Sequence, residues 1–186
     1  SAGVNYAFKE GSFAYLSYAK SFRYPVLDEL FNFFTSTINA DLTSQRTDGF
    51  ETGLRYAFSG RSYAHLNLFH SSTDDEIFCN PLPFANENLD GKAVRTRAEI
   101  FFEVPAAEWL TLSGSYAYVE TNIDGGIYDG SRVPNVPKSK AALAAVFTPA
   151  KGLALTLEGI YVGERPFISD YGNELGAQEA YTVVNG

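Results

Sequence analysis

Long hydrophobic runs are missing from this sequence of 186 residues. The longest clear apolar run covers residues 141–147, far short of the roughly 20 residues that a membrane-spanning helix needs. The single cysteine, Cys79, rules out an internal disulfide framework, and no signal-peptide pattern is present. These absences exclude a helical membrane span. They leave open a β-barrel, which crosses a membrane with strands of about 9 to 11 residues.

Basic residues are also few, because 14 Lys and Arg stand against 22 Asp and Glu and give a net charge of −8. This balance argues against a nucleic-acid-binding surface, which needs clustered positive charge. The sequence shows no set of nucleophile, base and orienting residue, and no phosphate-binding loop. We therefore expect neither an enzyme nor a bound cofactor or metal.

Aromatic residues are abundant, with 15 Phe and 12 Tyr, and many of them take part in an alternation of apolar and polar residues. The alternation is plainest in residues 48–70, where two runs are joined by the short turn 59–61. In the first run Leu54 lies on one parity, and Glu51 and Arg55 lie on the other. Successive side chains of a strand point to opposite faces, so each run predicts a strand with one apolar face. Together the two runs predict a β-hairpin.

Similar alternation recurs along the chain and predicts eight full strands and the start of a ninth. Outside the hairpin, the expected strands cover residues 4–8, 12–22, 91–104, 109–120, 138–147, 153–163 and 181–185. Short turns alternate with long connections at residues 23–45, 73–89, 122–137 and 164–179, the first with a helical turn or two at 27–34. Alternate connections of a meander lie at opposite ends of the strands. One end of the sheet is therefore expected to carry only short turns, and the other end to carry the long loops.

This asymmetry is typical of an outer-membrane barrel, which has short periplasmic turns and long extracellular loops. Alternation alone leaves two orientations open, because a soluble sandwich or small barrel buries the apolar parity, whereas a membrane barrel turns it toward lipid. Aromatic residues near strand ends and the one-sided loops favour lipid. We predict an all-β, antiparallel up-and-down meander, a segment of a transmembrane β-barrel. The charges expected to face the lumen are Glu51, Arg55, Arg95, Arg97, Glu99 and Glu158.

A few isolated residues could carry a site, but an ordinary structural role is favoured for each. His65 and His70 lie five apart in one strand, so they point to opposite faces and cannot share a metal through one face. Cys79 lies in a loop, where a lone thiol is usually incidental. The acidic residues 74–76 could bind calcium, although a solvated loop is the favoured interpretation.

Residues 17–31, SYAKSFRYPVLDELF, resemble a stretch of TonB-dependent outer-membrane receptors. Residues 50–55, FETGLR, are similar to the next strand of that family. Further similar segments follow in the family's order at residues 75–78, 88–93, 136–140, 161–163 and 181–185. Each motif alone is weak, whereas their order and spacing over nearly the whole chain are specific.

The resemblance implies a barrel of about 22 strands with an N-terminal plug, of which residues 1–186 are a C-terminal part without plug or remaining strands. It implies a receptor in the outer membrane of a Gram-negative bacterium that imports an iron–siderophore complex or a similar scarce nutrient. Its partners would be membrane lipid, the plug, TonB through the plug, and the iron chelate. The expected ligand contacts are the loop aromatics Phe31, Phe33, Phe34 and Tyr128. A soluble ligand-binding β-sandwich or barrel and a passive porin are the alternatives.

Overall fold

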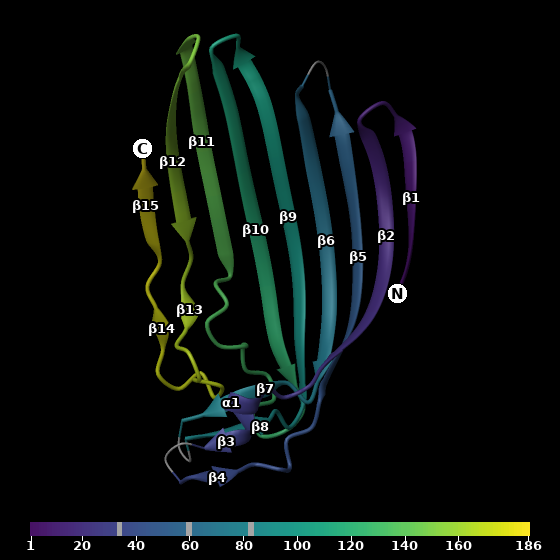
Figure 1. The fold of residues 1–186 in the computed structure, drawn as a ribbon, viewed down its shortest axis with the longest axis vertical. Coiled ribbons are helices and arrows are strands. Elements are labelled where there is room, and N and C mark those ends of the chain that lie inside the picture. Colours follow the sequence, from purple (N-terminus) through teal and green to yellow (C-terminus); the bar gives the residue numbers. More distant parts are fainter. Residues whose placement is uncertain (33–34, 59–60, 82–83) are drawn as a thin grey trace.

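The computed structural model describes residues 1–32, 35–58, 61–81 and 84–186. Within them, nine strands form one sheet in chain order, β1-β2-β5-β6-β9-β10-β11-β12-β15 (Figure 1). The bounds are β1 Ala2–Lys9, β2 Ser12–Arg23, β5 Gln45–Ala57, β6 Tyr63–Asp74, β9 Lys92–Ala107, β10 Leu110–Asp124, β11 Ser139–Ala150, β12 Leu153–Val162 and β15 Tyr181–Asn185. Every neighbouring pair is antiparallel, so the predicted meander is confirmed.

The two central strands are longer than the sequence pattern predicts. β9 continues through Pro105, where we expected a turn, and Pro105 pairs with Thr111 beside a register shift. β10 continues to Asp124, which pairs with Lys92 at the start of β9. In this extension Ile123 pairs with Ala93, and both side chains are buried at the loop end of the sheet.

The long connections contain short elements of their own, which gather at one end of the sheet (Figure 1). They are α1 Leu27–Leu30, β3 Phe31–Asn32, β4 Thr37–Ile38, β7 Ile77–Asn80, β8 Ala85–Asn88, β13 Arg165–Pro166 and β14 Ala177–Gln178. The predicted helical turn is confirmed as α1, but it ends at Leu30 because Phe31 has an extended backbone. The sequence pattern does not predict the β7-β8 hairpin, since its residues lack a strand-like alternation of apolar and polar side chains.

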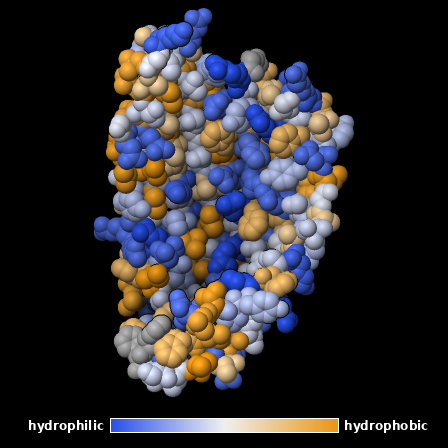
Figure 2. Space-filling view, viewed as in Figure 1, coloured by the Kyte–Doolittle hydropathy of each residue, from blue (hydrophilic) through white to orange (hydrophobic). Residues whose placement is uncertain are grey.

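The register gives the sheet two chemically different faces. Leu54, Leu66 and Ile100 lie side by side across β5, β6 and β9, and the residues one position away form a polar face. Hydrophilic side chains gather over the middle strands in Figure 2. On the apolar face, Leu143 is 63% exposed and Leu157 is 57% exposed. The described residues place no second sheet over this face, so they do not form the two-layered sandwich that was the alternative.

The buried hydrophobic cluster lies instead at the loop end of the sheet. It consists of Phe78, Leu89, Ala93, Ile123 and Val133, and we call it the loop core. Helices contribute little here: no helix in the described ranges has the length and apolarity to span a membrane. The four long loops converge at this end of the sheet. A binding site is therefore expected there.

Candidate functional site

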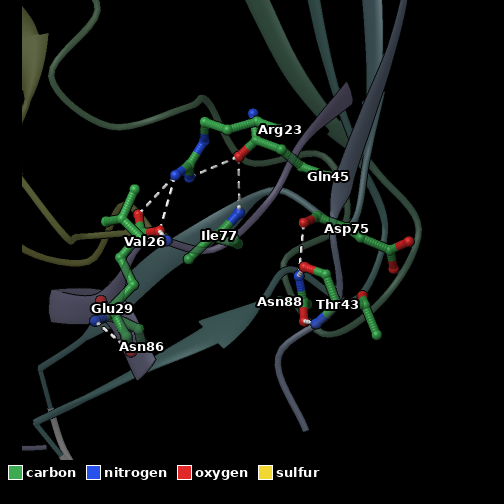
Figure 3. A network of polar contacts seen from close by, with 9 residues as sticks. All are labelled: Arg23, Val26, Glu29, Thr43, Gln45, Asp75, Ile77, Asn86 and Asn88. Atoms are coloured by element: carbon green, nitrogen blue, oxygen red, sulfur yellow. Dashed lines mark hydrogen bonds and ion pairs between the residues drawn. The ribbon is translucent and has the colours of Figure 1, made fainter. Parts of the chain in front are cut away.

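The first long loop is fastened at its base by Arg23, the last residue of β2 (Figure 3). Its guanidinium donates hydrogen bonds of 3.0 and 2.8 Å to the two carboxylate oxygens of Glu29 in α1, and one of 2.9 Å to Gln45 Oε1. Because Arg23 lies so close, the pKa of the Glu29 carboxyl falls below its ordinary value. The Glu29 carboxylate also accepts the backbone N–H of Val26 at 2.9 Å, which closes the first turn of α1. The loop thus begins and ends at one charged cluster.

Two asparagines of the β7-β8 hairpin join that first loop to the second (Figure 3). Asn86 Nδ2 donates to the backbone oxygen of Glu29 at 3.1 Å. Asn88 Nδ2 donates to the carbonyls of Asp75 at 2.7 Å and Thr43 at 3.1 Å, and Asn88 Oδ1 accepts the N–H of Thr43 at 2.8 Å. These residues were not singled out from the sequence, although the Asn-rich segment 86–88 is typical of side chains that satisfy loop backbones.

The second, third and fourth loops meet through aromatic rings that pack on the loop core. The ring centroid of Phe78 lies 4.3 Å from Tyr171 and 6.2 Å from Tyr128, and the two tyrosines are 5.8 Å apart. Burial raises the pKa of Tyr171, with a further contribution from the nearby Glu76 carboxylate. The rings therefore connect three loops that are far apart in the sequence.

Polar contacts reinforce the junction of the third and fourth loops. Asn173 Oδ1 accepts the backbone N–H of Arg132 at 2.7 Å, and Asn173 Nδ2 donates to its carbonyl at 3.0 Å. The buried carboxylate of Asp170 accepts the N–H groups of Glu174 and Leu175 at 2.9 and 3.0 Å. All four loops are thus joined in the folded chain, with the β7-β8 hairpin contacting both sides.

Two of the four predicted ligand-contacting aromatics fall within the described residues. Phe31 lines a small cavity of about 160 Å³ between α1 and the β7-β8 hairpin, together with Asp28, Asn39 and Cys79. Tyr128 is half-buried against the loop core. Phe33 and Phe34 lie outside the described residues. The geometry groups Phe31 and Tyr128 at the loop end but on opposite sides of the hairpin, and their contact with a ligand stays a prediction.

The predicted lumen charges share the polar face of the sheet, where they have different partners. Arg95 forms a two-pronged ion pair with Glu76 at 2.7 and 2.8 Å, whereas Arg97 lies 3.6 Å from Glu99 on the same strand. The Arg55 guanidinium lies over the Tyr63 ring, 3.9 Å from its centroid, and Glu158 accepts a hydrogen bond from Asn185 at 3.3 Å. Most of these charges therefore use partners other than one another.

A polar cluster occupies the middle of this face around Glu51. Tyr15 donates its hydroxyl proton to Glu51 Oε1 at 2.9 Å, and Asn67 donates to the same carboxylate and to Tyr15. Asn67 is 7% exposed, and its Oδ1 has no partner within the described residues. Buried atoms without partners also occur on Arg55 and Arg97 nearby. A polar face of this kind suits a hydrated or protein-filled interior better than hydrocarbon.

The histidines lie as the sequence predicts, on opposite faces of β6. The ring of His65 lies 6.1 Å from that of Tyr15 on the polar face, whereas His70 Nδ1 lies 2.9 Å from Thr96 Oγ1 on the apolar face. In the part of the chain that the structure describes, no group of three or more His, Cys, Asp and Glu side chains is arranged to hold a metal ion.

The chain is similar to a family model over its whole length and to curated proteins over most of it. Residues 1–186 match the family model described as TonB dependent receptor-like, beta-barrel. The metal-pseudopaline receptor CntO of Pseudomonas aeruginosa is 32% identical over 148 residues, which cover 74% of this chain and 20% of that protein. The ferrichrome outer membrane transporter/phage receptor of Escherichia coli K12 is 26% identical over 98% of this chain and 24% of its own length. The chain thus spans about a fifth to a quarter of these curated relatives.

Solved structures share the fold. The ferric yersiniabactin uptake receptor FyuA from Yersinia pestis superposes with a TM-score of 0.76 at 21% identity, over 98% of this chain and 28% of that one. The siderophore receptor PiuA from Acinetobacter baumannii gives a TM-score of 0.75 at 20% identity, with the same coverage of both chains. At these identities the likeness establishes the nine-stranded architecture and no more.

Proposed function

Because this chain belongs to the TonB-dependent receptor-like β-barrel family, whose members reside in the outer membrane of Gram-negative bacteria and are not enzymes, we propose that it is part of the barrel of an active-transport receptor for a metal chelate. One observation carries the proposal. The sheet combines an uncovered apolar face, a polar face and four long loops that meet at one end. A barrel wall in a membrane needs the first two features, and a receptor needs the third.

The loop end is the capture surface in this proposal. Loops are where binding residues concentrate when a rigid scaffold positions them, and here the β9-β10 pair supplies the scaffold. The cross-loop contacts of Asn88 and the packing of Phe78 hold the loops together before any ligand arrives. Such preorganisation lowers the entropic cost of binding. Phe31 and Tyr128 are the described aromatics proposed to contact the ligand, together with Phe33 and Phe34.

The polar face is proposed to contact the plug of the complete receptor. The cluster of Tyr15, Glu51 and Asn67 and the neighbouring Arg55 and Arg97 offer donors and acceptors in the middle of the sheet. A plug segment would satisfy such groups, which a dry interior would penalise. TonB would act on the receptor through this plug, and energy-driven movement of the plug would release the captured nutrient inward.

The substrate class follows from the relatives by analogy. One relative is a receptor for metal–pseudopaline and another is a transporter of ferrichrome, so both relatives are named for metal chelates. We propose an iron–siderophore complex or similar metal chelate as the substrate of the receptor that carries this chain.

Uptake by intact cells tests the proposal. A strain lacking the receptor gene would be supplied with radiolabelled ferric chelates, and the complete gene would be restored on a plasmid. We expect restored uptake of at least one chelate, and we expect that uptake to stop when the proton gradient is discharged. Uptake that continues without the gradient would favour the passive porin, and no gene-dependent uptake of any metal chelate would contradict the proposal.

Substitutions then separate capture from folding. Phe31→Ser is expected to weaken chelate binding about tenfold or more if the ring contacts the ligand. Leu27, which is 78% exposed in the same loop, offers a matched control as Leu27→Ser. Equal affinity of the two variants and the parent receptor would remove Phe31 from the capture surface.

A further inference from the structure

The apolar face is hollowed toward its loop-side edge. A groove of about 310 Å³ lies there across β2, β5, β6, β9 and β10. Most of its residues belong to two adjacent rows of the apolar face, and Glu51, Phe69 and Arg97 belong to the row between them. The row farther from the loops consists of Leu16, Thr52, Leu68, Ala98 and Tyr118, paired strand to strand. The groove is therefore a feature of the barrel wall and is independent of the loop end.

Residue size explains the hollow. Thr52 and Ala98 are small and lie beside larger neighbours, so the surface dips where they stand. The larger residues that line it include Leu16, Phe50 and Tyr118. The result is an elongated depression lined mainly by carbon.

The loop-side end of the groove is polar. The next row, about 7 Å farther along the strands, places His70, Thr96 and Glu120 next to one another on β6, β9 and β10. His70 Nδ1 and Thr96 Oγ1 are 2.9 Å apart, and both side chains are exposed. Beyond this row the same face carries charged pairs, Lys20 with Asp48 at 3.5 Å and Lys92 with Asp74 at 3.2 Å. The side chains on this face thus change from apolar to charged within two rows of the sheet.

The change from apolar to polar lining along the groove indicates what kind of molecule would bind there. A hydrocarbon-lined groove that ends at hydrogen-bonding side chains fits an amphiphile with an apolar chain and a polar end. The face is continuous with the wall that contacts the membrane in the proposed receptor, so lipid surrounds it. We propose that the groove binds one acyl chain of a membrane lipid, with the lipid's polar end at the His70–Thr96 pair. The inference rests on the proposed membrane placement of the barrel and adds a specific site to it.

Filling the groove tests the inference. The complete receptor and its Ala98→Leu variant would be purified in mild detergent, supplied with dipalmitoyl phosphatidylethanolamine and weighed by native mass spectrometry. We expect the parent to keep one lipid that the variant binds about tenfold more weakly. Ala141→Leu is the matched control, because Ala141 lies on the same face between Tyr116 and Tyr161, outside the groove. Its lipid occupancy should equal that of the parent.

A second measurement locates the lipid. A photoreactive residue replacing Leu68 in the groove should crosslink to the lipid, whereas one replacing Ala144 on the polar face should not. Equal lipid retention by Ala98→Leu and the parent, no retained lipid in any protein, or a Leu68 crosslink to a second receptor copy would each overturn the inference. Chelate uptake by Ala98→Leu should match the parent. Absence of chelate uptake by the parent receptor would instead contradict the proposed function.

Discussion

Arg95 and Glu76 join the sheet to the β7-β8 hairpin through two parallel hydrogen bonds of 2.8 and 2.7 Å. Their side chains are largely shielded, and the backbone oxygen of Glu76 accepts the N–H of Leu89 at 2.8 Å. A charge-assisted bidentate pair is stronger than a single neutral hydrogen bond and also fixes geometry. The pair thus anchors the hairpin that links the loops.

Glu76→Gln in the complete receptor is expected to loosen this anchor by about 2 kcal/mol, because Arg95 keeps its charge but loses a charged partner. Hydrogen exchange at the Leu89 amide should become faster, while exchange in β5 should stay unchanged. The double variant Glu76→Gln with Arg95→Gln should lose less than the sum of the single changes. Strict additivity would show that the two side chains do not act together.

A pH dependence is expected at the base of the first loop. The pKa of Glu29 in the folded chain lies below its ordinary value of 4.5 because Arg23 binds the carboxylate, so the unfolded loop takes up a proton first as pH falls. The stabilising contribution is complete above about 4.5 and is lost as pH falls toward the lower, folded pKa. The protection factors of the backbone amides in this loop, which correct exchange rates for their intrinsic pH dependence, should therefore fall below pH 4.5. Glu29→Gln should show no such fall in that window, and identical pH profiles of the protection factors would refute the assignment.

The loop core should respond strongly to truncation. Phe78 is 6% exposed and touches Tyr128 and Tyr171, so Phe78→Ala is expected to destabilise the loop end by about 3 to 5 kcal/mol. Ile127, which is 80% exposed in the third loop, provides the control Ile127→Ala with an expected change near zero. Limited proteolysis of the receptor in membranes would compare the two. Equal resistance to protease would show that the rings do not hold the loops together.

The strands could be predicted from the sequence because their alternation has a physical origin. Leu54, Leu66 and Ile100 had to share a face once each segment was extended, and the register places them side by side. The position of Arg55 on the polar face, with Glu51, follows from the same period of two. The ends of β9 and β10 could not be predicted, since Pro105 is typical of a turn and Ile123 is a single apolar residue among polar ones, yet both are paired in the sheet.

The contacts between the loops could not be predicted from the sequence, for a different reason. Asn88 meets Thr43 across 45 residues, and Phe78 meets Tyr171 across a still longer stretch, so no local pattern relates them. Tyr128 stood out as an aromatic residue in a loop, but its packing on Phe78 depends on how three loops converge. Side-chain hydrogen bonds to distant backbone groups cannot be identified until the fold is known.

Orientation in the membrane is the property on which the rest depends, and one pair of neighbouring residues tests it. Leu143 lies in the middle of the apolar band of β11, and Ala144 points to the opposite, polar face, where it pairs with Glu158 in the register. Leu143→Arg should cost about 2 to 4 kcal/mol, because a lipid-facing arginine near the bilayer midplane loses its hydration. Ala144→Arg should be tolerated, because it can pair with Glu158 across the strands. The abundance of folded receptor in outer membranes reports both effects, and a greater loss for Ala144→Arg would reverse the two faces.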